Sequence, residues 1–316
     1  MVKVAFAGGS GNVGQEIIDV LVATGKHEIL ILSRKDIPTE PTPGITWAKT
    51  NYEDTEQLAD LLQGVHTVLS FVTEQESTSS PLQRNLINAA IKAGVKRFAP
   101  SEWATSGTQH LPWYAYKKDI RGYLSEINAE RKVLEYTFFQ PGLFTNYLTR
   151  PYKSSKHIHP IEIPIDFENG RAIIVEGSES SEITLTTVQD LASIVAQAID
   201  YEGEWPVVSG INGTTITMGE VIALGEKLRG KKFTVERVRK EDFKSGTWET
   251  SWVPTVDHPS IPADKVADFS RFGVAGILLG MDAEVFRVSD EWNRLLPGYK
   301  FVQAEAFLAE AWKGKP

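Results

Sequence analysis

The amino-acid sequence predicts an α/β fold, in which a doubly wound parallel sheet is joined to a smaller mixed α/β lobe. Short apolar runs alternate with segments of helical period in the first half of the chain, as βαβ units require. A glycine-rich turn directly follows the first apolar run. Beyond Pro151 the alternation ends, and prolines, extended pieces and helices follow in mixed order.

The first half forms the regular part of this fold. Apolar residues three and four apart indicate helices, and the short apolar strands suit a sheet that is covered on both faces. The expected strands are Val2–Ala7, Glu28–Ser33, Thr67–Phe71, Arg97–Pro100 and Tyr136–Gln140. The expected helices are Val13–Thr24, Thr55–Leu62, Leu82–Ala93 and Tyr116–Asn128.

The second half is expected to form a substrate lobe. We place the first domain at residues 1–151 and the lobe at residues 152–316, with segments that pack back on the first domain. A capping box predicts a helix start at Thr217. The expected elements are helix Val188–Ile199, strand Pro206–Ser209, helix Thr217–Leu228, strand Lys232–Val238 and helices Asp282–Trp292 and Gln303–Trp312.

Composition excludes several classes of protein. Apolar residues make up 41% and charged residues 23% of the 316 positions, which is ordinary globular usage. A net charge of −8 without a basic stripe argues against a nucleic-acid partner, and the absence of cysteine excludes disulfides and thiolate chemistry. The apolar runs are too short for a signal peptide or a membrane span. We therefore expect a cytoplasmic monomer or homodimer.

The turn after the first strand carries a phosphate-binding pattern. The turn contains both Gly9-x-Gly11-x-x-Gly14 and Gly8-x-x-Gly11-x-x-Gly14, spacings typical of a Rossmann-type domain, where the backbone approaches a pyrophosphate at a helix N-terminus. The residues expected to contact the dinucleotide in this turn are Gly8, Ser10, Gly11, Asn12, Val13 and Gly14.

The end of the second strand indicates which dinucleotide binds. An acidic residue at this point would accept hydrogen bonds from a ribose hydroxyl, but the chain has Arg34 and Lys35. Two cations suit a 2′-phosphate, although Asp36 follows directly. The expected cofactor is NADP(H).

Two lysines compete for the catalytic role. Tyr114 and Lys118 have the spacing of the tyrosine and lysine of short-chain dehydrogenases. Helical phase favours Lys117, which lies in line with Ile120 and Leu124 on the apolar side of its helix. Burial there would lower the pKa of the amine toward a value useful for proton transfer.

The chain resembles the NmrA-like and isoflavone-reductase-like branch of the atypical short-chain dehydrogenases. The resemblance covers nearly the whole chain. It is carried by the glycine turn and by the segments 97–103, 117–121, 140–147, 184–192 and 210–238. It implies an NADPH-dependent reductase in which Lys117 supplies or relays a proton. It also implies an aromatic or phenylpropanoid-like substrate, reduced at a C=C bond, a carbonyl or a quinone-methide carbon.

Further site residues are expected at the carboxyl ends of the strands, where ligands of open α/β sheets bind. Those expected at the cofactor are Phe71, Pro100, Ser101, Lys117, Pro141 and Phe144. Those expected at the substrate are Glu102, Trp103, Phe144, Asn146 and Tyr147. Trp113, Trp248 and Trp252 are further candidates for an aromatic wall. His157 and His159 have no third ligand nearby, so no metal site is expected.

Two other functions stay open. Relatives on this fold that lack the lysine act as NADP(H)-sensing regulators rather than enzymes. The other alternative is a short-chain alcohol dehydrogenase that uses Tyr114 and Lys118.

Overall fold

The computed structural model of the chain describes residues 1–40, 42–74, 79–255 and 263–316. The chain divides into two compact units. The first unit comprises residues 1–103, 113–140 and 191–210, and the second comprises residues 104–112, 141–190 and 211–316. The assignment of nucleotide binding to residues 1–151 and of substrate binding to residues 152–316 stays a prediction.

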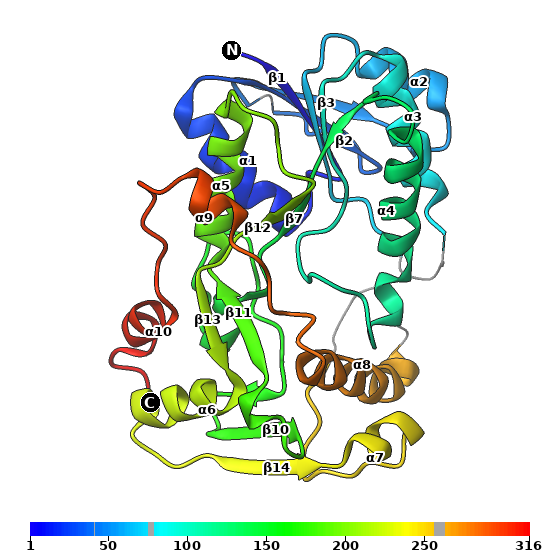
Figure 1. Cartoon of the computed structure of the whole chain (residues 1–316). Helices are drawn as coiled ribbons and strands as arrows, with labels where there is room; N and C mark the ends of the chain where they lie inside the picture. The colour runs from blue at the N-terminus through cyan, green and yellow to red at the C-terminus, as the bar shows by residue number, and fades with distance from the viewer. Residues whose placement is uncertain (41, 75–78, 256–262) are drawn as a thin grey trace. The chain divides into compact units, whose positions relative to one another are not determined.

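A parallel sheet forms the centre of the first unit, and it confirms the doubly wound fold (Figure 1). Its strand order is β3-β2-β1-β4-β5-β6, so the chain starts in the middle and winds outward in both directions. All neighbouring strands of this sheet are parallel. The strands are β1 (Lys3–Ala7), β2 (Glu28–Ser33), β3 (Ile45–Lys49), β4 (Thr67–Ser70), β5 (Arg97–Ala99) and β6 (Glu135–Tyr136).

Helices cover both faces of this sheet (Figure 1). Apolar side chains of α2 (Thr55–Leu61), α3 (Pro81–Lys92) and α4 (Ala115–Ile127) form one core with alternate residues of the strands. The opposite face is covered by α1 (Asn12–Thr24) and α5 (Val188–Asp200) (Figure 1). Because helices cover both faces of the sheet, the ligand-accessible part of the sheet is its carboxyl edge.

Two features of the first unit differ from the predictions. Strand β3 was not predicted, because its side chains are only partly buried and no continuous apolar run marks it. The predicted strand Tyr136–Gln140 is divided at Thr137, whose hydroxyl contacts Pro206 O at 2.6 Å. Beyond this residue, β7 (Phe138–Gln140) leaves the large sheet and pairs with β12 (Val208–Gly210).

The second unit has two small sheets, with the strand orders β14-β10-β9 and β13-β11-β8. Their strands are β8 (Leu143–Phe144), β9 (Ile165–Asp166), β10 (Arg171–Val175), β11 (Glu182–Thr186), β13 (Thr214–Thr217) and β14 (Thr234–Val238). Its helices include α6 (Met218–Arg229), α7 (Lys240–Ser245), α8 (Val266–Asp282), α9 (Glu291–Leu295) and α10 (Ala304–Trp312). The predicted capping box is present, with Thr217 and Glu220 bonded reciprocally at the start of α6.

The predicted helix Asp282–Trp292 is wrong. Helix α8 ends where this helix was expected to begin, and Glu284 has a φ of +55°, which α-helical geometry does not allow. Residues 283–286 form a turn, residues 287–290 have no regular secondary structure, and Phe286 O accepts a hydrogen bond of 3.0 Å from the backbone N–H of Thr184 in β11. Hydrogen bonds to Thr184 therefore take the place of helical hydrogen bonds at this point.

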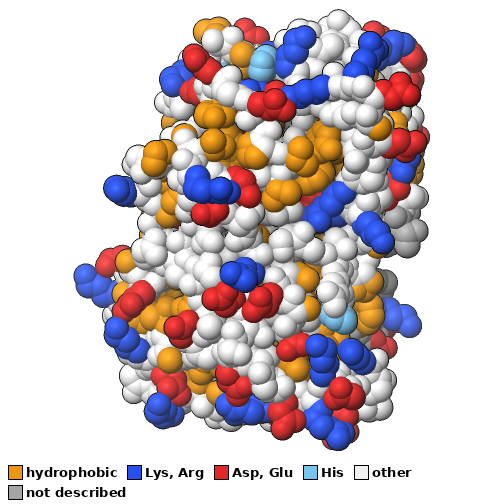
Figure 2. Space-filling model, viewed as in Figure 1, with side chains coloured by type: hydrophobic (Ala, Val, Ile, Leu, Met, Phe, Trp, Pro, Cys, Tyr) orange, Lys and Arg blue, Asp and Glu red, His pale blue; other side chains and the backbone are white. Residues whose placement is uncertain are grey.

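Acidic and basic side chains are interspersed on the face of the molecule that Figure 2 shows. Within the described ranges, the search for an apolar helix of membrane-spanning length found none.

Candidate functional site

The glycine loop between β1 and α1 is shaped by close backbone contacts. Gly8 has a φ of +74°, in the left-handed region that favours glycine. A Cβ atom on Gly9 would lie 2.5 Å from the Cβ of Phe6, and one on Gly14 would lie 2.9 Å from the Cα of Gly9. These glycines are therefore required by the packing of the loop itself.

Gly11 has no such requirement. It is exposed, it has an ordinary φ of −81°, and a Cβ there would meet Gly8 O at 3.4 Å with no closer atom among the described residues. Gly11 is also the N-cap of α1, whose first turn contains no acidic residue. Open space next to the free N–H groups of a helix start is the arrangement that admits a phosphate.

Tyr52 supports this loop and was missed by the sequence analysis. Its buried hydroxyl accepts a hydrogen bond of 2.8 Å from the backbone N–H of Gly8 and donates one of 2.7 Å to Leu32 O. Burial raises the pKa of Tyr52 to about 12, so the hydroxyl stays protonated and keeps both bonds at neutral pH. Tyr52 precedes α2 and is distant from the loop in sequence, so no local pattern could have identified it.

The end of β2 lies beside the glycine loop. The hydroxyl groups of Ser10 and Ser33 are 3.3 Å apart, and Ser33 Oγ also accepts a hydrogen bond from the backbone N–H of Lys35. The side chains of Arg34 and Lys35 are exposed. The neighbouring carboxylate of Asp36 forms an ion pair of 2.5 Å with Lys49 on β3.

The segment after β5 is fixed at each residue from Ser101 to Trp103. The backbone N–H of Ser101 donates to Gln83 Oε1 at 2.7 Å. Arg121 donates to both carboxylate oxygens of Glu102, at 2.8 and 2.6 Å. The indole N–H of Trp103 donates to Ser70 O at 2.7 Å.

Lys117 is the buried amine of this site. Its side chain lies on the inward face of α4 with Ile120 and Leu124, which confirms the prediction from helical phase. Only 2% of the residue is exposed. Its Nζ donates a hydrogen bond of 2.5 Å to Glu102 O and lies 3.5 Å from the centre of the Tyr114 ring. Burial lowers the pKa of Lys117 to about 8.

The two tyrosines beside Lys117 are held in their neutral form. Burial raises the pKa of Tyr114 to about 12, and it raises the pKa of Tyr116 as well. Lys118, by contrast, is exposed. The structure thus brings Tyr114 together with Lys117, through its ring face, and leaves Lys118 outside the buried group.

Aromatic rings form a stack at the carboxyl edge of the sheet. Phe71 packs on Trp103 with ring centres 4.5 Å apart, and Trp103 packs on Phe139 at 5.5 Å. Phe71 is partly exposed, whereas Trp103 and Pro100 are buried. Burial on both sides favours a packing role for Trp103, and its contact with substrate stays a prediction.

Pro141, Phe144, Asn146 and Tyr147 belong to the second unit. Phe144 is buried and packs edge-on against Tyr147, with ring centres 5.7 Å apart. Asn146 Oδ1 accepts a hydrogen bond of 2.9 Å from the backbone N–H of Val188, and its amide nitrogen contacts Ser154. These contacts give Asn146 a structural role, and its contact with substrate stays a prediction.

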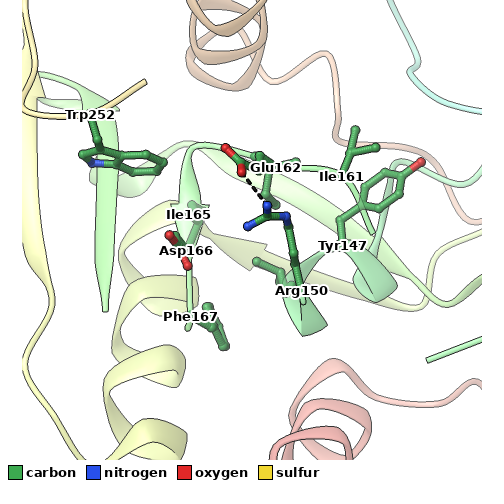
Figure 3. Close-up of a pocket in the computed structure, with 10 residues that line it drawn as sticks. Tyr147, Arg150, Ile161, Glu162, Ile165, Asp166, Phe167 and Trp252 are labelled. Atoms are coloured by element: carbon green, nitrogen blue, oxygen red, sulfur yellow. Dashed lines mark ion pairs between the residues drawn. The ribbon is translucent and has the colours of Figure 1, made fainter. Parts of the chain in front are cut away.

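Tyr147 also lines a small pocket in this unit (Figure 3). The ion pair between Arg150 and Glu162 (2.5 Å) crosses the pocket, which has a volume of about 10 Å³. That is room for about one water molecule rather than for a substrate.

A larger cavity of about 530 Å³ lies in the second unit, within the size range of small-molecule pockets. Its apolar walls come from α7, α8 and the loop between them, and they include Phe243, Trp248 and Phe272. Arg271 adds a cation, which lies 4.4 Å from the centre of the Trp248 ring. Only Trp248 had been singled out in the sequence, because the other wall residues come together through the packing of α8.

The chain is similar to known proteins in sequence and in fold. A model of the NmrA-like family matches residues 2–256. The chain is 31% identical over 249 residues to Oxidoreductase BOA1 of Botryotinia fuckeliana, an alignment that covers 76% of this chain and 80% of the relative.

Solved structures share the fold across almost the whole chain. The NADPH-dependent quinone oxidoreductase QOR2 of Escherichia coli, in complex with NADPH, aligns with a TM-score of 0.67 and 23% identity, over 98% of this chain and all of the other. AtPrR2 with NADP⁺ and (+)pinoresinol aligns with a TM-score of 0.67 and 19% identity, over 98% of both chains.

Proposed function

The chain belongs to the NmrA-like family, and we propose that it is an NADPH-dependent oxidoreductase that reduces a small organic molecule. The observation that carries the proposal is Lys117, a buried amine with a lowered pKa at the carboxyl edge of a sheet that also carries a phosphate-binding turn. The names of the relatives, which include an oxidoreductase and an NADPH-dependent quinone oxidoreductase, support the same function.

The residues present fit a dinucleotide. Space over Gly11 and the uncapped start of α1 suit the pyrophosphate. Arg34 and Lys35 suit the 2′-phosphate of NADPH, and Asp36 does not oppose this, since its carboxylate is engaged by Lys49. When bound, NADPH would supply the hydride for the reduction.

The chain's own contribution is the proton. The ammonium form of Lys117 holds a proton on Nζ and can release it to a substrate oxygen that gains electron density. A pKa of about 8 keeps most of the amine protonated at pH 7 while making it a better acid than an exposed lysine. The ring face of Tyr114 lies against the same amine and shields Nζ from water. The phenol of Tyr114 stays neutral at this pH.

The direction of the pH dependence follows from this role. Reduction needs the protonated amine, so kcat/KM should fall as the pH rises past about 8. The reverse, oxidative direction needs the free amine, so its rate should rise over the same range.

We propose an aromatic or phenylpropanoid-like substrate that is reduced at a C=C bond, a carbonyl or a quinone-methide carbon. The quinone and pinoresinol in the names of structural neighbours support an aromatic substrate.

The test compares two adjacent lysines. NADPH oxidation is followed with a panel of quinones and phenylpropanoid ketones, and NADPH binding is measured by calorimetry. Lys117→Ala should abolish turnover and leave NADPH binding largely intact, whereas Lys118→Ala should keep both, because its side chain is exposed.

Each other outcome assigns a different function. Loss of turnover in Lys118→Ala and Tyr114→Phe, with activity kept in Lys117→Ala, would instead indicate a tyrosine-dependent alcohol dehydrogenase. Tight NADPH binding without turnover on any acceptor would indicate a regulator.

A further inference from the structure

We propose that Glu102 and Arg121 form a positioning pair that holds the Lys117 amine and places two opposite, mutually compensating charges beside it, and that Glu102 does not contact the substrate. The inference rests on the proposed function of Lys117 and adds how that amine is controlled. It also revises the expectation that Glu102 binds substrate.

Glu102 is buried and paired with Arg121. Its side chain is 1% exposed, and both carboxylate oxygens are bound by the guanidinium of Arg121 in the two-pronged geometry that arginine favours. Arg121 in turn lies over the ring of Phe138, 5.5 Å from its centre. Both oxygens of this carboxylate are engaged by one arginine in a structural ion pair, which favours a positioning role for Glu102 over substrate binding.

The backbone of Glu102 links this ion pair to Lys117. The acceptor of the Nζ hydrogen bond is the carbonyl oxygen of Glu102 itself, at 2.5 Å. The side chain of the same residue is anchored to α4, the helix that carries both Lys117 and Arg121. The ion pair therefore fixes the carbonyl that aims the amine.

Glu102 and Arg121 also place opposite charges near the Lys117 amine. The Glu102 carboxylate raises the pKa of Lys117 and the Arg121 guanidinium lowers it, so the two effects oppose each other and burial determines the outcome. Among the described residues, the ring of Tyr114 also lies against Nζ, and its phenol is neutral. Removing one member of the pair should thus leave the opposite charge acting on the amine without compensation.

The test uses single substitutions that remove one charge each. The pKa of Lys117 is measured by NMR on protein with isotope-labelled lysine, without NADPH or substrate, and its signal is assigned through Lys117→Met. Arg121→Gln should raise the pKa and Glu102→Gln should lower it, each by about one pH unit, a tenfold change in the ratio of charged to free amine. The double variant should lie close to the wild type.

A matched control breaks another ion pair of α4. Arg84 pairs with Asp119 on the same helix, away from Lys117, so Arg84→Gln should leave the pKa of Lys117 unchanged. The upper limb of the pH profile of kcat/KM should move with the measured pKa in each variant. If Arg121→Gln does not fold, Arg121→Lys keeps the charge and should keep the pKa, while Glu102→Gln should still lower it.

Shifts of the same sign in Glu102→Gln and Arg121→Gln, or shifts no larger than that of the control, would overturn the proposal. A merely structural role predicts loss of stability without opposite pKa changes. Because the pKa is read without turnover, this result is independent of whether Lys117→Ala abolishes activity.

Discussion

At the scale of single residues, Gly9 and Gly11 lie in the same loop but should respond differently to a methyl group. The Cβ of Gly11→Ala would point into open space, so the fold should lose only what alanine costs at an N-cap, about 0.5–1 kcal/mol. The same methyl group would occupy the space that a pyrophosphate needs. We expect the Kd for NADPH to rise on the order of tenfold or more, which calorimetry can measure.

Gly9→Ala is the matched control for this effect. Its Cβ would lie 2.5 Å from the Cβ of Phe6 in the core, so β1 or α1 must move, at a cost of about 1–3 kcal/mol. Thermal unfolding should show a larger loss in Gly9→Ala than in Gly11→Ala. Equal NADPH affinity in Gly11→Ala and the wild type would contradict a phosphate at this position.

At the scale of elements, the end of β2 should determine the choice of cofactor. Charge-assisted hydrogen bonds contribute about 1.5–3 kcal/mol, but exposed side chains deliver less because water and salt screen them. Replacing Arg34 and Lys35 by alanine should therefore weaken NADPH binding about tenfold and change NADH binding little. Titrations with both coenzymes at low and high salt measure this.

Asp36→Asn is the control for the β2 prediction. Its carboxylate is paired with Lys49, so its loss should alter neither affinity beyond about twofold. An unchanged preference in the Arg34 and Lys35 variant, or a strong gain of NADH binding in Asp36→Asn, would assign the selectivity elsewhere.

Elements were predictable from sequence where burial repeats regularly. β2 has the predicted bounds and α1, α2, α3 and α4 begin within about a residue of them, because helices buried against a sheet show a continuous period. Strand β3 could not be predicted, because its half-buried position at the edge of the sheet leaves no regular pattern of apolar residues. The helix predicted at Asp282–Trp292 is absent because hydrogen bonds to β11, which is distant in sequence, determine the conformation of that segment.

In the candidate site, too, local features could be predicted from the sequence and tertiary contacts could not. The inward direction of Lys117 followed from helical phase, which is a local property. The partners of the loop and of the amine did not follow, because Tyr52 reaches Gly8, and Arg121 reaches Glu102, only after the sheet is assembled. Sequence pattern therefore locates reactive groups, and tertiary contacts determine their chemistry.

At the scale of the whole molecule, a buried amine makes folding stability depend on pH. Lys117 has a pKa of about 8 in the folded state against an ordinary value of 10.5, so the unfolded chain binds this proton more tightly. Stability is reduced below pH 8 and recovers as the pH rises from 8 to 10.5, by about 3 kcal/mol in total. Tyr52 and Tyr114 act in the opposite direction above pH 10, because their pKa values are raised to about 12.

Comparison with Lys117→Met isolates this contribution, since the tyrosines are present in both proteins. Methionine fills the same space without a charge, and the lost hydrogen bond to Glu102 O adds an offset that does not vary with pH. The free energy of unfolding of Lys117→Met minus that of the wild type should thus be largest near pH 7 and decrease steadily toward pH 10. Urea unfolding at several pH values measures the difference, and a constant value across this range would mean that Lys117 keeps an ordinary pKa in the folded protein.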